Sequence, residues 1–89
     1  MVEVLRQAIE KFGYQNQITV AIEELSELAK ELCKWNRGES NDDHIAEEIA
    51  DVEIMLMQLK MMFRNPVDVE IWKAQKVARL KERIEGNER

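Results

Sequence analysis

The chain has 89 residues, enough for one domain spanning residues 1–89 with a modest core, and its formal net charge of −5 argues against a DNA- or RNA-binding protein. Its single cysteine, Cys33, excludes an internal disulfide and is consistent with a reducing, cytoplasmic location. We expect neither a signal peptide nor membrane association, because no apolar run approaches the roughly 20 residues of a membrane helix.

Helix-breaking residues divide the sequence into four predicted helices, and the sequence lacks strand-like alternation. The predicted helices span approximately residues 2–12, 16–37, 44–64 and 67–84. Gly13 and Gly38 follow the first two helices, Pro66 opens the last, and residues 86–89 are expected to form a frayed tail. Because the turn between the second and third helices is short, these two should be antiparallel neighbours. The predicted fold class is therefore all-α, an antiparallel helical bundle.

Each long predicted helix carries an apolar stripe at helical spacing. The stripes consist of Ile18, Ile22, Leu25, Ala29 and Leu32 in the second helix and of Ile45, Ile49, Val52, Leu56, Leu59 and Phe63 in the third. Residues 54–63 are apolar almost all round, and such a helix is buried almost all round. Four helices of this length cannot bury it alone, so we expect the bundle to be completed by homo-oligomerisation, as a dimer or tetramer. The alternative is a loosely packed, Met-rich monomer core.

Two pairs of acids lie three residues apart, Glu24 with Glu27 and Glu48 with Asp51. Residues at this spacing are neighbours on a helix surface, so each pair forms a two-carboxylate patch. The short turn brings the patches within about one or two helical turns of each other along the axis. Four converging carboxylates repel one another unless a hard divalent cation binds them, and all-oxygen ligation suits Mg²⁺ or Mn²⁺.

The alternative interpretation is that these acids are ordinary solvated side chains, since the chain has 14 Glu and 4 Asp and the same spacing recurs elsewhere. The chosen pairs differ because both lie against apolar stripes and both motifs open with a doubled acid. The first acids of the doublets, Glu23 and Glu47, point away from the inferred site by helical phase and are not expected to be ligands.

Residues 21–30, AIEELSELAK, and 45–52, IAEEIADV, resemble the EExxE and ExxD motifs of the MazG-type all-α nucleoside triphosphate pyrophosphohydrolases. The resemblance implies packed helices assembled across subunits and cleavage between the α- and β-phosphates, giving a nucleoside monophosphate and pyrophosphate. It also implies that Glu24, Glu27, Glu48 and Asp51 hold Mg²⁺.

Further residues are candidates for catalysis and substrate binding. Glu27 is the choice for a carboxylate that accepts a proton from, or orients, the attacking water. Lys76 and Arg79 on the fourth predicted helix are candidate phosphate contacts, although a solvated basic ridge is the commoner use of such a run. Trp35 is a candidate for stacking on the base, although such residues are more often core or interface aromatics.

Two alternatives to a nucleoside triphosphate pyrophosphohydrolase stay open. Within the same fold class, the similar phosphoribosyl-ATP pyrophosphatases act on another pyrophosphate-linked nucleotide, and a substrate of that kind is the first alternative. A different class is a catalytically silent, metal-binding helical module with a role in regulation or assembly. The sequence selects neither the base nor the sugar of a nucleotide.

Overall fold

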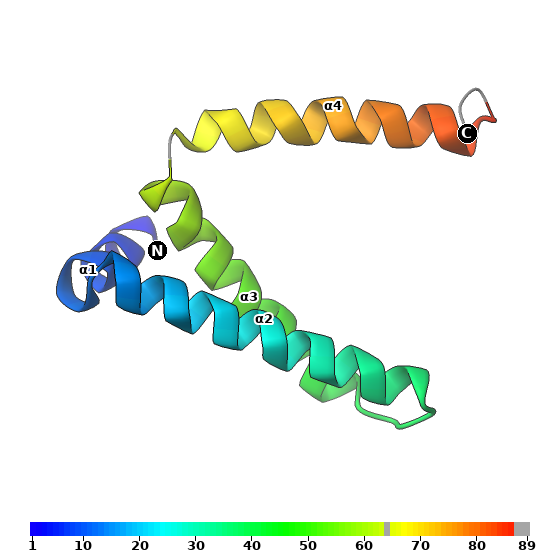
Figure 1. Ribbon diagram of the computed structural model, residues 1–89, viewed down its shortest axis with the longest axis horizontal. Helices are drawn as coiled ribbons and strands as arrows, with labels where there is room; N and C mark the ends of the chain where they lie inside the picture. Colours follow the sequence, from blue (N-terminus) through cyan, green and yellow to red (C-terminus); the bar gives the residue numbers. More distant parts are fainter. Residues whose placement is uncertain (64, 87–89) are drawn as a thin grey trace.

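The computed structural model describes residues 1–63 and 65–86, and every regular element in these ranges is helical. The helices are α1 Val2–Phe12, α2 Tyr14–Asn36, α3 Asp42–Met62 and α4 Pro66–Ile84 (Figure 1). The all-α prediction is therefore confirmed. Among the described residues, no helix combines the length and apolar character needed to cross a membrane.

The predicted helix boundaries agree with the structure to within about two residues. α2 begins at Tyr14 because Gly13 alone makes the turn, at a positive φ of 88° that favours glycine. α4 begins with Pro66, and the side chain of Asn65 caps it by accepting a hydrogen bond of 2.9 Å from the Val67 N–H. The predicted end of the third helix at Arg64 and the tail residues 87–89 lie outside the described residues.

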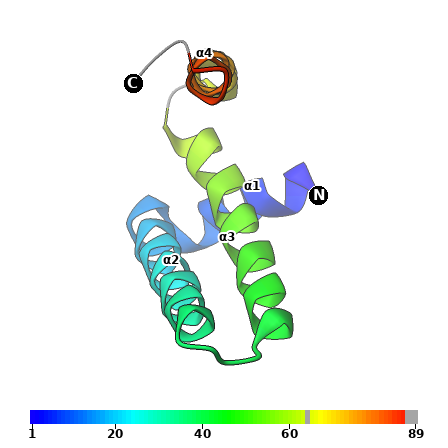
Figure 2. The same cartoon turned by 90° about the vertical axis from the view of Figure 1, so that its right-hand side faces the viewer.

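α2 and α3 form an antiparallel hairpin, and α1 crosses it near the start of α2 and the end of α3 (Figures 1 and 2). The small core lies where these three helices meet. Its buried apolar side chains are Leu5, Ile9, Ala21, Val52, Met55 and Met62. The seam between α2 and α3 is partly polar, because Gln17 Nε2 donates a buried hydrogen bond of 2.7 Å to Gln58 Oε1.

Most of the two apolar stripes lies outside this seam, although Val52 of the α3 stripe is buried in the core. Six of their large side chains are exposed in the single chain: Ile22, Leu25 and Leu32 of α2, and Ile49, Leu56 and Phe63 of α3. In α2 the residues that face α3 include Gln17, Ala21 and Glu31, which lie about a quarter turn away from the stripe. The sequence therefore places its strongest apolar face outside the hairpin. Homo-oligomerisation, which would cover this face, stays a prediction.

α4 projects away from the other helices, and among the described residues it contacts the hairpin through α3 alone, near the C-terminal end of α3 (Figure 1). There Glu70 pairs with Lys60 of α3 at 3.2 Å and with Lys73 of α4 at 3.4 Å. The rest of α4 leaves Ile71, Trp72, Val77, Leu80 and Ile84 exposed. An amphipathic helix is stabilised mainly by packing its apolar side against a partner, and most of α4 has no such partner among the described residues.

Candidate metal centre

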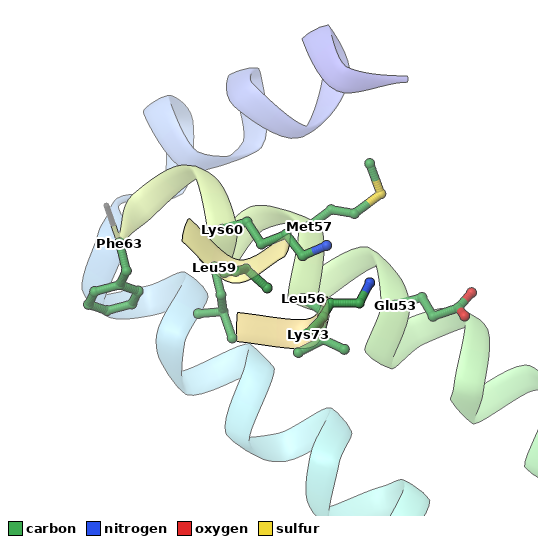
Figure 3. A pocket seen from close by; sticks show the side chains of 8 residues that line it. Glu53, Leu56, Met57, Leu59, Lys60, Phe63 and Lys73 are labelled. Carbon is green, nitrogen blue, oxygen red and sulfur yellow. The ribbon is translucent and has the colours of Figure 1, made fainter. Parts of the chain in front are cut away.

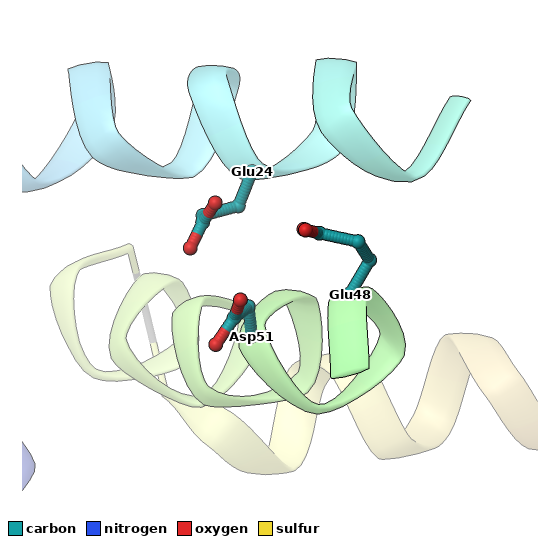
Figure 4. Close-up of side chains that lie close together, drawn as sticks. All are labelled: Glu24, Glu48 and Asp51. Atoms are coloured by element: carbon teal, nitrogen blue, oxygen red, sulfur yellow. The ribbon is translucent and has the colours of Figure 1, made fainter. Parts of the chain in front are cut away.

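Three carboxylates converge in the space between α2 and α3 (Figure 4). Glu24 comes from α2, whereas Glu48 and Asp51 come from successive turns of α3. One oxygen from each lies within 4.8 Å of the other two, and all three residues are half-buried. We call these residues the acid cluster. Two helices and two different turns thus supply three oxygen donors to one small volume.

Hydrogen bonds at both ends of the hairpin fix the position of α2 along α3. At one end Gln17 binds Gln58, and at the other Asn41 Nδ2 donates to the Glu31 carbonyl oxygen at 2.9 Å and to Glu31 Oε1 at 2.8 Å. Glu24 lies seven residues from both Gln17 and Glu31 and therefore on the same side of α2. The seam residues consequently aim Glu24 at α3, where Glu48 and Asp51 lie.

The acid cluster is electrostatically unsatisfied. Burial raises the pKa of Glu24, and the negative charges of Asp51 and Glu48 raise it further. Burial likewise raises the pKa of Glu48, followed by the charge of Asp51. Glu48 Oε2 is buried without a hydrogen-bond partner. A buried carboxylate oxygen that lacks a donor and faces other acids is stabilised either by a proton or by a cation.

Glu27, the fourth predicted ligand, does not belong to this group. Its side chain is exposed, one turn along α2 from Glu24. Its negative charge still contributes to the raised pKa of Glu24 and of Glu48, so it lies near the cluster without sharing its centre. The structure thus brings together three of the four predicted metal ligands.

The structure does not bring the predicted substrate-binding residues to the acid cluster. Lys76 lies over the ring of Trp72 on the same helix, 5.9 Å from its centroid. Lys76 and Arg79 both belong to α4, which makes no contact with α2 within the described residues. Trp35 is exposed in the last turn of α2, about three turns beyond Glu24. A nucleotide site that included these residues would need more than the single chain described.

Sequence analysis missed a second acidic site, at Glu31. Its carboxylate is buried and accepts hydrogen bonds from Asn41 and from Lys34 Nζ at 3.2 Å, and His44 Nδ1 lies 3.8 Å away. We call these four residues the Glu31 network. The hydrogen bonds from Asn41 and Lys34 lower the pKa of Glu31. The seven-residue spacing between Glu24 and Glu31 could have placed Glu31 on the seam, because residues seven apart lie on the same side of a helix.

Comparisons of the chain with protein-family models, with curated proteins and with solved structures gave no match.

Proposed function

We propose that the chain is a Mg²⁺-dependent nucleotide pyrophosphohydrolase that works as a homo-oligomer and cleaves a nucleoside triphosphate into monophosphate and pyrophosphate. The observation that carries the proposal is the unpartnered, buried Glu48 Oε2 within a group of three carboxylates from two helices. The motif resemblance in residues 21–30 and 45–52 supplies the reaction.

The donor set of the acid cluster fits a hard divalent cation. Its ligand atoms are all carboxylate oxygens, which suit Mg²⁺ or Mn²⁺ rather than softer metals, and no described His or Cys belongs to the group. A cation would also remove the repulsion that, with burial, raises the pKa values of Glu24 and Glu48. Mg²⁺ commonly binds through few carboxylates and takes substrate phosphates as further ligands.

In this proposal the residues divide the work. A bound Mg²⁺ would neutralise phosphate charge and increase the acidity of a water molecule. Glu24, Glu48 and Asp51 would hold the ion. Glu27 is exposed beside them, so its carboxylate can accept the proton of the attacking water. The water oxygen forms the new bond to the α-phosphorus, the bond from that phosphorus to the bridging oxygen breaks, and pyrophosphate leaves.

One observation favours the alternative of a silent metal-binding module. The candidate phosphate contacts Lys76 and Arg79 lie on α4, apart from the acid cluster, so the single chain has no cationic side chain of that helix in place for a triphosphate. In the enzyme, these residues would have to reach a site in another copy or take no part in binding.

A panel of nucleotides separates the two proposals. The full-length chain is incubated with Mg²⁺ and each common ribo- or deoxyribonucleoside triphosphate, and with phosphoribosyl-ATP, and pyrophosphate release is measured. We expect release with at least one nucleotide and its loss on chelation of the metal. If no nucleotide is cleaved, and calorimetry still detects Mg²⁺ binding, the silent module is the better description. Absence of both would refute the metal centre itself.

A further inference from the structure

One side of α4 repeats apolar residues at helical spacing. Val69, Val77, Leu80 and Ile84 share one side of the helix, and Lys73 lies among them, at successive intervals of four, four, three and four residues along the series. Val69 and Lys73 line a groove of about 620 Å³ against α3 (Figure 3). The last three side chains continue the same side beyond that groove and are exposed, Ile84 by 77%.

The hairpin presents a matching apolar surface. We call the six exposed stripe residues, Ile22, Leu25, Leu32, Ile49, Leu56 and Phe63, the hairpin face. The two stripes lie on the same side of the hairpin, because each is rotated by about a quarter turn in the same sense from the seam and the helices are antiparallel. Leu56 and Phe63 also line the groove at α4, so the hairpin face is continuous with it.

The described residues on either side of position 64 direct α4 away from the hairpin, so these two apolar surfaces lie apart. Phe63 and Asn65 have extended backbones, with φ of −111° and −86°. Asn65 caps α4, Pro66 stands in its first turn, and Glu70 joins Lys60 of α3 to Lys73 of α4. These contacts set the direction of α4 at its first turns, away from the hairpin (Figure 1). The chain therefore does not cover the apolar side of its own α4 beyond the groove.

Charge favours a second copy of the chain as the partner of the two surfaces. α4 carries five basic and three acidic side chains, whereas the exposed charged side chains of α2 and α3 are six acidic ones and one basic one, Lys30. The apolar side of a cationic helix thus complements an apolar face on an anionic hairpin. Each copy of the chain offers both surfaces, so two copies satisfy each other in one closed, symmetric arrangement.

We propose that α4 of one copy docks on the hairpin face of a second copy while the second copy's α4 docks on the first, giving a reciprocal dimer. This inference rests on the self-association included in the proposed function and not on its metal chemistry, because no residue of the acid cluster belongs to the hairpin face. Loss of the dimer and loss of Mg²⁺ binding are therefore separate results.

The test uses the full chain in light scattering across a dilution series. The wild type should have twice the 10.5 kDa chain mass at micromolar concentration. Leu80→Lys on α4 and Leu56→Asp on the hairpin face should each raise the dimer dissociation constant by about 100-fold or more, as loss of a central interface contact does. Gln75→Lys, on the opposite side of α4, is the matched control and should leave the dimer intact. Circular dichroism checks that helicity is unchanged.

A mixture of the two variants tests the reciprocity. In a mixed dimer, one α4–hairpin contact is that of the wild type, and the other places the new lysine of the Leu80→Lys copy against the new aspartate of the Leu56→Asp copy. In a dimer of either variant alone, each of the two contacts contains one unpaired charge. The mixture should therefore associate at least ~10-fold more tightly than either variant alone. A monomeric wild type, a dimer insensitive to Leu80→Lys, or a mixture no tighter than its components would each overturn the proposal.

Discussion

The α2–α3 seam holds two groups of acids in opposite electrostatic states. In the Glu31 network, Asn41 and Lys34 donate hydrogen bonds to the carboxylate and lower its pKa. In the acid cluster, two turns away, burial and neighbouring acids raise the pKa of Glu24 and Glu48, and Glu48 Oε2 lacks a partner. The same hairpin thus satisfies the Glu31 carboxylate with its own donors and leaves a buried oxygen of Glu48 without one. The first arrangement is what stability requires, and the second is what a cation site requires.

The largest expected difference between the two groups is in catalysis. Glu48→Gln and Asp51→Asn keep the side-chain shape and remove a charged ligand, so pyrophosphohydrolase turnover should fall by about 100-fold or more if metal activation supplies most of the rate. Asn41→Ala, in the Glu31 network, should leave turnover of the folded protein nearly unchanged.

Glu47→Gln is the matched control, since it makes the same change one residue from Glu48 on the exposed side of α3. Turnover is measured by pyrophosphate release at saturating Mg²⁺. Equal losses for Glu47→Gln and Glu48→Gln would contradict the assignment of the site to the seam.

The next largest effect should be on stability, and the two groups should respond with opposite sign. Asn41→Ala removes two hydrogen bonds to buried Glu31 and should lower the free energy of unfolding by about 1–3 kcal/mol. Glu48→Gln removes one of several repelling acids and should leave the metal-free protein as stable as the wild type or more so. Urea denaturation without metal measures both, and a destabilised Glu48→Gln variant would argue that the cluster is structural.

Mg²⁺ should stabilise the protein through the acid cluster alone. A ligand that binds only the folded state at about ten times its dissociation constant adds about 1.4 kcal/mol to the free energy of unfolding. The melting temperature should therefore rise with MgCl₂ beyond the rise given by NaCl of equal ionic strength. Asn41→Ala should keep this difference and Glu48→Gln should lose it; an identical response to both salts in the wild type would indicate solvated acids.

The smallest effect should be on the pH dependence of stability. The lowered pKa of Glu31 means that its contribution is present above the ordinary glutamate pKa and is lost as pH falls through the folded-state value. The raised pKa values of Glu24 and Glu48 act in reverse, because the native state holds these protons longer, so stability falls as pH rises from the ordinary value through the raised one.

Metal-free melting curves measured from pH 3 to pH 8 test both directions. Asn41→Ala should weaken the acid-side loss, whereas Glu48→Gln should weaken the decline above the ordinary glutamate pKa. A pH profile unchanged in both variants would contradict the electrostatic contrast.

Helix number and boundaries could be predicted because glycine and proline act locally. Gly13 and Pro66 interrupt or open helices through their own backbone preferences, whatever the tertiary packing. The convergence of Glu24, Glu48 and Asp51 was predictable for a similar reason, since a short turn and helical spacing fix it.

The packing could not be read in the same way. Hydrophobic periodicity selected the stripe with Ile22 and Leu56, but the single chain exposes both and builds its seam around Gln17, Gln58 and Glu31. Periodicity identifies which face is apolar and not which partner covers it, so a face reserved for another chain cannot be separated from an internal core. Which acids of α2 face α3 depends on which side of α2 forms the seam, so the position of Glu27 outside the acid cluster could not be predicted either.

The Gln17–Gln58 and Glu31–Asn41 contacts have a mechanical consequence for the residues between them. They lie 14 residues apart on α2, about 21 Å, with Glu24 midway. Sliding one helix by a single residue, about 1.5 Å, would disturb both contacts at once. Sliding of the helices is therefore not a route by which the repulsion within the acid cluster can relax. Neutralisation, by a proton or by a bound cation, removes the repulsion and leaves both ends of the hairpin in place.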